Sequence, residues 1–289
     1  MSVIVNMACG LANRMFQYAF YLRLQKDGYD VYIDYFTTAD LAHESVDWFR
    51  IFPRAIFRQA TASDIKKMGG GHGLLSKVRR KFFPFTTNVL EMKGAFDAVF
   101  PSLNKDTYML GVFQNVEIVE SVSLDVRKAF VFPEFESEKN RNLQQCMSQE
   151  NSVAIHVRKG SDYQKRIWYQ NTCGVEYYIK AVEQITEKVT NPHFYVFTDN
   201  PVWVKENMSW LDYKLVEGNP GFGWGSHCDM QLMSLCKHNI ISNSTYSWWS
   251  AFLNTNANKI VIGPKIWFNP QSCDEYVSDR TMCKDWILI

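Results

Sequence analysis

The chain has 289 residues, of which 46% are hydrophobic and 21% charged, so it is long enough for two folded domains of ordinary size. Its net charge of +1 gives no general attraction to nucleic acid, and any anion site must therefore be local. The seven cysteines form no Cys-x-x-Cys pair, and the sequence shows neither a basic leader nor an apolar run of roughly 18 residues. These features favour a reduced, cytoplasmic protein over a secreted, zinc-binding or membrane-spanning one.

The first half opens with a predicted βαβ unit, formed by a strand at 2–7, a helix ending near residue 27 and a strand at 31–35. Its first turn lacks the Gly-x-Gly-x-x-Gly spacing, which counts against a nicotinamide or flavin enzyme. Asn13 and Arg14 lie at the start of the helix. Either both residues contact a ligand, or Asn13 is a helix cap and Arg14 a solvated cation. The sequence alone leaves both interpretations open.

A glycine-rich stretch at 68–73 predicts a mobile surface loop, without the Gly-Lys-Ser/Thr ending of a phosphate-binding loop. The cations that follow it, interleaved with apolar residues, are Lys77, Arg79, Arg80 and Lys81. Such a run is usually a solvated face, and the alternative is peripheral contact with an anionic membrane surface.

The rest of the first half predicts a strand at 108–113 and a helix at 115–130. The polar stretch 134–150 predicts a helix or linker that joins the two halves. We therefore expect a domain boundary near residue 150.

The second half is organised around Val153–Val157, a short β-branched run that predicts a strand buried on both faces of a parallel sheet. Polar residues follow at or just past its end, namely His156, Arg158, Lys159 and Asp162. The carboxyl edge of a parallel sheet is where ligands bind, and the two cations favour an anion. A surface Arg–Asp pair at a strand end is the alternative.

Helices and strands then alternate regularly, which predicts a parallel sheet with helices on both faces. The predicted elements are helix 174–190, strand 193–197, a helix to 208, strand 213–216, helix 229–237, strand 238–242, helix 245–254 and strand 259–262. Two such halves with a cleft between them suit a transferase with two substrates.

Polar side chains recur at successive strand ends of this half. They are His156, Arg158 and Asp162 after the first strand, Thr198, Asp199 and Asn200 after the second, and Asn243, Ser244, Thr245 and Ser247 near the last helix. Each group alone could be a helix cap, but three groups at one sheet edge are better explained by one shared ligand. Of the adjacent Trp248 and Trp249, at most one can face that ligand.

Three stretches resemble the α-1,2-fucosyltransferases of glycosyltransferase family 11. Gly10-Leu11-Ala12-Asn13-Arg14-Met15-Phe16-Gln17-Tyr18-Ala19 is similar to their opening motif. His156-x-Arg158 with Asp162-Tyr163 resembles their His-x-Arg-Arg-x-Asp-Tyr motif, and residues 229–254, with Ser-Thr-Tyr-Ser-Trp-Trp at 244–249, resemble the third.

The resemblance implies an α/β protein with two Rossmann-like domains facing a cleft, the GT-B arrangement. Residues 1–150 would form the acceptor side, and residues 151–289 would bind GDP-fucose. The implied reaction is inverting transfer of L-fucose from GDP-β-L-fucose to the 2-hydroxyl of a terminal β-galactose, with no metal or other cofactor required. The acceptor glycan could be lipid-linked, with the enzyme cytoplasmic or peripheral to the inner face of a membrane.

The strand-end groups and the resemblance together give the expected donor-binding residues, Asn13, Arg14, His156, Arg158, Asp199, Asp229, Ser244 and Thr245. The resemblance places His156 and Asp229 near the guanosine and lets Asn13 reach across the cleft, whereas the sequence alone leaves Asp229 a possible helix cap.

The expected catalytic residues are Arg158, His156 and Asp162. The guanidinium of Arg158 can hold phosphate oxygens bidentately as negative charge develops on the leaving pyrophosphate. Asp162 is the candidate base for the acceptor hydroxyl, and Trp248 the candidate acceptor contact. We expect no metal ligands.

The sequence departs from the family pattern at Lys159, which replaces the usual second arginine, at Ser161, which looks inserted, and at Asn200, where an aspartate is common. Two other functions therefore stay open. One is a GDP-fucose-dependent transferase with another acceptor, N-acetylglucosamine or a protein hydroxyl. The other is a nucleotide- or glycan-binding protein without turnover.

Overall fold

A computed structural model describes residues 1–35, 47–71, 73–92, 103, 105–272 and 278–289, without the side chains of residues 162 and 164. The chain forms two compact units, one of Met1–Pro133 with Phe222–Trp224, the other of Glu134–Gly221 with Gly225–Ile289. Among these residues, no helix combines the length and the apolar character needed to cross a bilayer.

The units meet in sequence at 133/134 rather than near residue 150. The stretch expected to link the halves contains helix α7 (Glu138–Gln149), whose Leu143 and Met147 are buried in the core of the second unit. Since this apolar side belongs to the second core, the helix is part of the second unit and not a linker.

The first unit contains a four-stranded parallel sheet in the order β2-β1-β4-β3. Its strands are β1 Ser2–Asn6, β2 Asp30–Asp34, β3 Val89–Glu91 and β4 Thr107–Leu110. Its helices are α1 Leu11–Lys26, α2 Trp48–Ile51, α3 Ala62–Met68, α4 Leu74–Phe82, α5 Val116–Ser121 and α6 Ser123–Ala129, with a 3₁₀ turn at Pro84–Thr86.

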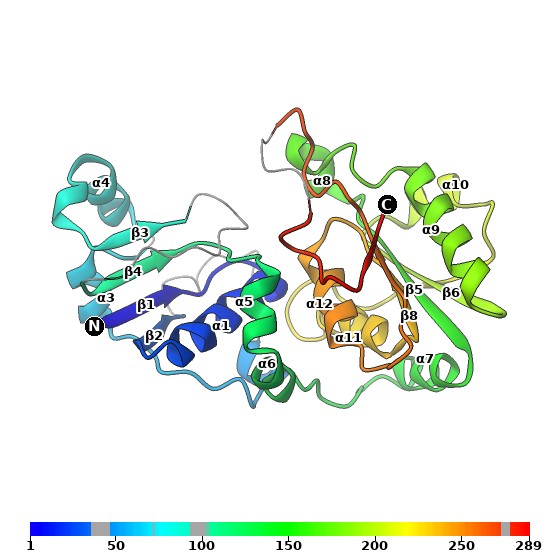
Figure 1. Ribbon diagram of the computed structural model, residues 1–289, viewed down its shortest axis with the longest axis horizontal. Coiled ribbons are helices and arrows are strands. Elements are labelled where there is room, and N and C mark those ends of the chain that lie inside the picture. The colour runs from blue at the N-terminus through cyan, green and yellow to red at the C-terminus, as the bar shows by residue number, and fades with distance from the viewer. Residues whose placement is uncertain (36–46, 72, 93–102, 104, 273–277) are drawn as a thin grey trace. The chain divides into compact units, whose positions relative to one another are not determined.

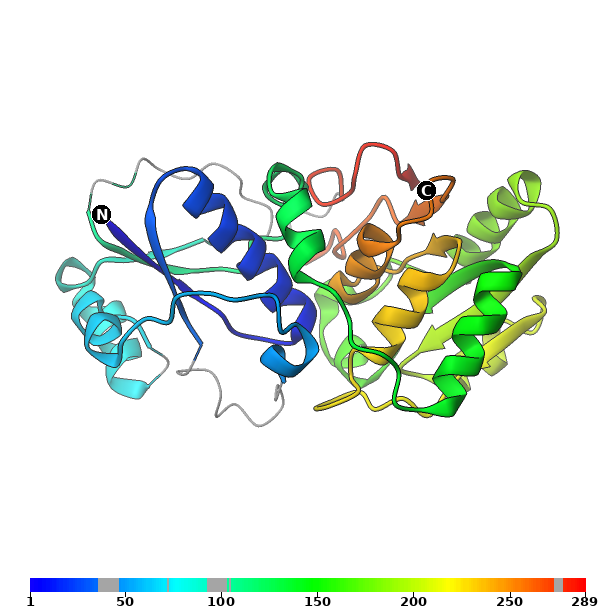
Figure 2. The same ribbon diagram turned by 90° about the horizontal axis from the view of Figure 1, so that it is seen from below.

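Helix α1 crosses one face of this sheet with α5 beside it (Figure 2). Its Phe16 and Phe20 are fully buried, and the ring of Phe20 stacks on that of Phe113, with centroids 4.0 Å apart. Aromatic side chains of this size supply much of the core burial of a small unit.

The glycine-rich stretch at 68–73 differs from the expected surface loop. Gly69, Gly70 and Gly71 are buried, and a Cβ on Gly70 would lie 2.4 Å from the ring of Tyr108. Glycine is therefore needed for close packing against the sheet at this point, because any side chain would collide with the tyrosine.

The second unit contains a six-stranded sheet in the order β10-β9-β8-β5-β6-β7, with every pair parallel (Figure 1). Its strands are β5 Asn151–Val157, β6 Pro192–Thr198, β7 Tyr213–Val216, β8 His238–Ile240, β9 Val261–Gly263 and β10 Ile287–Leu288. Besides α7, its helices are α8 Ser161–Lys165, α9 Val175–Lys188, α10 Pro201–Asn207, α11 Cys228–Leu235 and α12 Thr245–Leu253, with a 3₁₀ turn at Ile167–Tyr169.

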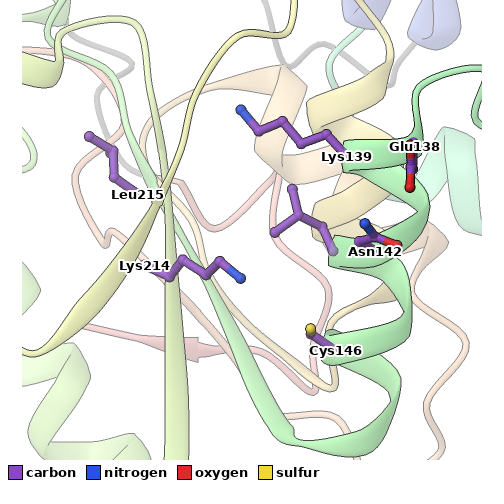
Figure 3. A pocket seen from close by; sticks show the side chains of 7 residues that line it. Glu138, Lys139, Asn142, Cys146, Lys214 and Leu215 are labelled. Atoms are coloured by element: carbon purple, nitrogen blue, oxygen red, sulfur yellow. The ribbon is translucent and has the colours of Figure 1, made fainter.

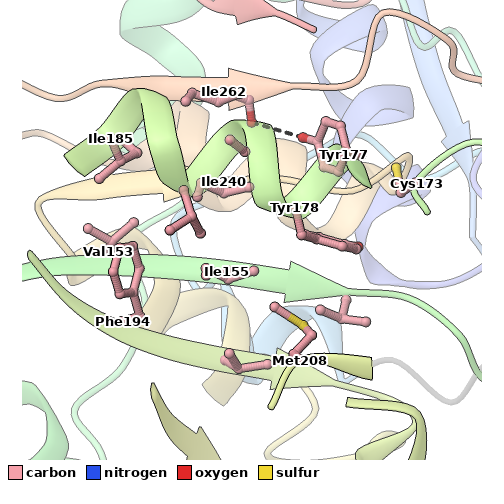
Figure 4. Close-up of a cluster of buried hydrophobic side chains, with 14 of the residues drawn as sticks. Val153, Ile155, Cys173, Tyr177, Tyr178, Ile185, Phe194, Met208, Ile240 and Ile262 are labelled. Atoms are coloured by element: carbon pink, nitrogen blue, oxygen red, sulfur yellow. Dashed lines mark hydrogen bonds between the residues drawn. The ribbon is translucent and has the colours of Figure 1, made fainter. Parts of the chain in front are cut away.

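Alternate residues of the central strand β5 enter two different cores, as a strand covered on both faces requires. Val153, Ile155 and Val157 pack with helix α9 (Figure 4). Ala154 packs in the other direction, in the cluster that contains residues of α7 and α11. The expected α/β class, with a parallel sheet in each of two units, is confirmed.

Each sheet has a point at which the strand order reverses. In the second unit the chain runs outward from β5 through β6 to β7 and then returns to add β8 on the other side of β5. In the first unit β1 has β2 on one side and β4 on the other. In open parallel sheets, ligands bind at such switch points, at the carboxyl ends of the strands.

Candidate functional site

His156 lies at the switch point of the second sheet, near the end of β5. Its Nδ1 shares a 2.7 Å hydrogen bond with the hydroxyl of Ser242, which is buried just past the end of β8. This bond joins the end of β5 to the segment just before the predicted group at 243–247, although Ser242 itself was not among the predicted residues. Burial, assisted by the nearby positive charge of Arg158, lowers the pKa of His156 from 6.5 to about 3, so the ring is neutral at physiological pH.

Arg158 follows His156 at the same sheet edge and is half-buried. Its guanidinium carbon lies 4.5 Å from the centroid of the Tyr169 ring, within the distance of a cation–π interaction. Packing against an aromatic face limits the rotamers of the arginine and fixes the plane of its guanidinium.

Tyr246 connects the beginnings of α11 and α12. Its hydroxyl donates to the backbone oxygen of Ser226 at 2.7 Å and accepts from the backbone nitrogen of Met230 at 2.8 Å. The tyrosine ring also lies 6.1 Å from the ring of His156, centroid to centroid. Tyr246 belongs to the third motif, but nothing in the sequence indicates that it connects the two helix starts.

Asp229, in the first turn of α11, is next to the residue that Tyr246 contacts. Its Oδ1 accepts a 2.7 Å hydrogen bond from the side-chain amide of Asn219, and burial raises its pKa. That amide is itself held by Asn140 of α7, whose side chain donates to Asn219 Oδ1 at 2.9 Å. The possible role of Asp229 as a helix cap is not observed, since His227 is the residue that precedes α11.

Ser244 and Thr245 lie at the amino end of α12. Ser244 is the cap residue, and its hydroxyl accepts a 3.3 Å hydrogen bond from the backbone nitrogen of Tyr246. Thr245 is the first residue of the helix and is half-buried. The amino end of a helix attracts anions through its free N–H groups and its dipole, which makes this end of α12 suitable for a phosphate.

Asp199 lies on the other side of β5, where it holds a turn. Its Oδ1 accepts from the backbone nitrogen of Lys159 at 2.7 Å, and Asn200 donates to the backbone oxygen of Lys159 at 2.9 Å. These bonds fix the backbone that follows β5, so the geometry gives Asp199 and Asn200 a positioning role for Arg158.

Lys159 is buried, with 7% of its surface exposed. Its ammonium donates to the hydroxyl of Tyr163 at 2.8 Å and lies 5.2 Å from the ring centroid of Trp203. Lys159, which departs from the family pattern, thus packs against Tyr163 and Trp203 at the turn that follows β5.

Asp162, the candidate base, belongs to α8, but its side chain lies outside the described part of the structure. Its role stays a prediction. Ser161, the residue that looks inserted, is the exposed first residue of that helix.

Trp248 does not fit the expected acceptor contact. It is fully buried, its ring stacks on Phe252, and its indole N–H donates to the backbone oxygen of Thr281 at 2.7 Å. Trp249 is fully buried as well. Both tryptophans are therefore core residues, because the face of α12 that carries them packs inward.

The switch point of the first sheet brings together the loops after β1 and β4. Asn13 is half-buried, and its side-chain oxygen accepts from the amide of Gln114 at 2.9 Å. Gln17 joins the same loops, since its oxygen accepts from Ala8 N and its nitrogen donates to Gly111 O, both at 2.9 Å. Sequence reasoning missed Gln17 and Gln114, although Gln17 is part of the opening motif.

Arg14 is not the solvated cation considered above, and its role as a ligand contact stays a prediction. It is 1% exposed, its Nε donates to the backbone oxygen of Cys9 at 2.7 Å, and its guanidinium carbon lies 5.1 Å from the Tyr35 ring centroid. Cys9 has a positive φ of 72°, which is unfavourable for a residue other than glycine. The buried arginine therefore stabilises a strained turn.

A shallow pocket lies between α7 and β7, away from the switch point of the second sheet (Figure 3). Its lining residues are Glu138, Lys139, Asn142, Leu143, Cys146, Lys214 and Leu215. None of the expected site residues is among them.

Comparison with known proteins agrees with the motifs. The profile of glycosyl transferase family 11 matches residues 91–289. An α-1,2-colitosyltransferase of Escherichia coli is 34% identical over 134 residues, which are 44% of this chain and 44% of that protein. The O-antigen biosynthesis glycosyltransferase WbnK of Escherichia coli is 39% identical over 121 residues, 41% of this chain and 39% of that protein. The chain thus spans less than half the length of these curated relatives.

Among solved structures, the fold is similar to that of a NodZ α-1,6-fucosyltransferase soaked with GDP-fucose. The similarity covers 87% of this chain and 92% of that one, at 12% identity and a TM-score of 0.49. The family profile covers more than half of the chain, and the opening and central motifs suggested the same family. The chain belongs to glycosyl transferase family 11.

Proposed function

We propose that the chain is an inverting galactoside α-1,2-fucosyltransferase that uses GDP-β-L-fucose and requires no metal ion. Family membership supports glycosyl transfer, and the name of one relative, an α-1,2-colitosyltransferase, supports an α-1,2 linkage. The observation that carries the proposal is the convergence of His156, Arg158 and the amino end of α12 at the switch point of the second sheet.

Arg158 and the amino end of α12 would hold the pyrophosphate of the donor. The acceptor hydroxyl attacks the anomeric carbon of fucose, the bond from that carbon to the β-phosphate oxygen breaks, and GDP leaves with the electron pair. Negative charge on the leaving phosphate grows during this step, so a fixed guanidinium stabilises the transition state more than the ground state. A fixed cation at this place supports transfer without a metal ion.

His156 would contribute as a neutral hydrogen-bonding group. The low pKa keeps the imidazole uncharged, and the bond of Nδ1 to Ser242 fixes the orientation of the ring. The Nε2 edge would then contact the donor. Asp162 is the proposed acceptor of the proton from the attacking hydroxyl.

Asp229 would bind the guanine base. A carboxylate can accept from both N1–H and the 2-amino group of guanine, and Asn219 holds one of its oxygens in place. The link from α11 through Tyr246 to α12 supports a single donor site that includes both helix starts.

The test is transfer by the purified full chain from GDP-L-fucose in the presence of EDTA. The acceptor panel is lactose, the type 1 and type 2 disaccharides and N-acetylglucosamine, with the linkage of the product determined by NMR. An α-1,2-fucosylated galactoside is the expected product. A product on N-acetylglucosamine, or dependence on added metal, would contradict the proposal.

The identity of the donor sugar needs a separate experiment, because one relative is named a colitosyltransferase. GDP-colitose lacks the 3-hydroxyl of the fucose donor, so the two donors are compared at equal concentration with the same acceptor. A higher kcat/KM with GDP-fucose is expected. The opposite preference would keep the α-1,2 reaction but change the donor, and GDP binding with no turnover on either donor would indicate a binding protein.

A further inference from the structure

Helix α4 has the reverse of the usual amphipathic arrangement. It lies at the edge of the first unit beside β3 (Figure 1), and none of its residues is buried. Three residues, Ser76, Arg79 and Arg80, are only half-buried, while the other described residues of the helix are exposed. The polar side of the helix is therefore the one that faces the protein.

Two arginines hold this polar side in place. Arg80 donates to the backbone oxygen of Gly71 at 2.8 Å and to that of Gly69 at 3.2 Å. Arg79 donates to the backbone oxygen of Lys66 at 3.1 Å and to the hydroxyl of Thr86 at 3.1 Å. The carbonyls that accept from Arg80 belong to two buried glycines, so the helix has a fixed orientation.

The apolar side faces solvent. Leu75 is 86% exposed, Leu74 78% and Phe82 61%, and Val78 lies between them on the same side. The following turn adds Phe85, which is 82% exposed. Isolated exposed apolar residues are common, but a contiguous group of large ones on a fixed helix marks an interaction surface.

The charge of the same region indicates the kind of partner. Residues 65–90 contain six lysines and arginines and no acidic residue, whereas the whole chain has a net charge of only +1. On a helical wheel Lys77 and Lys81 lie on one flank of the apolar side and Arg79 on the other. Basic residues that flank Leu and Phe are typical of helices that lie in the interface of an anionic membrane.

We propose that α4 and the turn at Pro84–Thr86 form a docking surface for an anionic lipid bilayer. Leu74, Leu75, Phe82 and Phe85 enter the boundary between headgroups and acyl chains, and Lys77 and Lys81 contact the lipid phosphates. A second copy of the chain is the less suitable partner, because the two basic surfaces would repel each other. The proposal rests on α4 alone and does not depend on the transferase activity.

The test is co-sedimentation of the full chain with phosphatidylcholine vesicles, with and without phosphatidylglycerol. Binding is expected only to the anionic vesicles, and it should weaken as salt rises. Each basic residue near an anionic surface contributes about 1 kcal/mol, so Lys77→Glu with Lys81→Glu should reduce the partition coefficient by about tenfold or more. Leu75→Ser with Phe82→Ser should reduce it as well.

Matched variants elsewhere on the surface serve as controls. Leu124 of α6 is 72% exposed, so Leu124→Ser removes another largely exposed leucine from the same unit. Lys188→Glu with Lys284→Glu makes the same change in net charge at exposed sites in the second unit. Both controls should bind the anionic vesicles as the wild type does, and the melting temperature of every variant is measured to verify folding.

Three outcomes would overturn the proposal. In the first, the wild type does not bind anionic vesicles. In the second, the control variants lose as much binding as the α4 variants do. In the third, the wild type binds neutral vesicles as well as anionic ones, and the α4 variants do not change this binding. A fourth outcome would come from sedimentation velocity. The wild type would be a dimer that does not bind vesicles, and Leu75→Ser with Phe82→Ser would convert it to a monomer.

Discussion

The Nδ1 atom of His156 and the hydroxyl oxygen of Ser242 lie 2.7 Å apart and join the carboxyl ends of two adjacent strands that are distant in sequence. This bond crosses the switch point of the second sheet. It brings a residue of the central motif and a residue of the third motif into one site.

Replacing Arg158 tests the proposed stabilisation of the leaving group. Arg158→Ala should lower kcat by about 10²-fold or more, because a preorganised charge at the leaving phosphate is lost. Arg158→Lys should recover only part of the activity, because an ammonium cannot bind bidentately. Steady-state kinetics with GDP-fucose and lactose measure both effects.

The control for this prediction is Arg166→Ala, which removes an exposed arginine from the same segment. It should leave kcat unchanged. A near-normal kcat for Arg158→Ala would exclude Arg158 from the transfer step.

His156 should make stability depend on pH. Its pKa is lowered from 6.5 to about 3 in the folded protein. Between pH 6.5 and pH 3 the imidazole is therefore protonated in the unfolded chain but neutral in the folded protein. The contribution of His156 to the free energy of unfolding is therefore complete above pH 6.5 and falls as the pH drops toward 3.

His156→Gln removes this titration while keeping a polar side chain. The difference in the free energy of unfolding between wild type and variant should shrink steadily from pH 7 to pH 4, measured by urea unfolding at each pH. Burial also lowers the pKa of His238, but that residue is present in both proteins and its effect cancels. A difference that stays constant with pH would contradict the lowered pKa of His156.

Gly160 is expected to be intolerant of any side chain. A Cβ at this position would lie 2.6 Å from Oδ2 of Asp199, the carboxylate that holds the turn after β5. Gly160→Ala should lower the free energy of unfolding by about 1–3 kcal/mol, the usual effect of overpacking, and should also reduce kcat by displacing Arg158.

Gly221→Ala is the matched change, because nothing lies within 4 Å of a Cβ at that glycine. Thermal unfolding and kinetics of the two variants are compared directly. Equal effects would show that the contact between Gly160 and Asp199 has no special importance.

Gln17 should be important for the stability of the first unit. Gln17→Leu leaves Ala8 N–H and the carbonyl of Gly111 without their shared partner, and losing such buried bonds costs about 1–3 kcal/mol. The free energy of unfolding should fall by this amount in urea titrations.

Gln25→Leu provides the comparison on the same helix, since Gln25 is exposed near the end of α1 and its side-chain amide donates to the hydroxyl of Tyr21. It should change stability by less than about 0.5 kcal/mol, as exposed substitutions usually do. A larger loss for Gln25→Leu than for Gln17→Leu would contradict the bridging role of Gln17.

The sequence was sufficient to predict what depends on periodicity. The alternating strands and helices of the second half and the gathering of polar groups at its carboxyl edge follow from patterns of period 2 and 3.6 and from the topology of parallel sheets. The helix expected at 115–130 is instead two helices, α5 and α6, which meet at Val122 without a glycine or proline to mark the break.

Roles that depend on long-range packing were not predictable in this way. Arg14 and Lys159 are buried although charged side chains are rarely buried, and the residues next to them in the sequence give no indication of this burial. Trp248 is in the core because α12 turns that face inward, and a helical wheel cannot tell which of two broad apolar faces does so. The inverted orientation of α4 likewise depends on contacts with glycine carbonyls elsewhere in the chain.

The burial of Lys159 changes what its departure from the family pattern means for evolution. Its ammonium is enclosed by Tyr163 and Trp203, so the bulkier guanidinium of arginine would need a different set of neighbours. Across homologues, the residue at position 159 should therefore covary with positions 163 and 203. It should carry no information about which sugar a given homologue accepts.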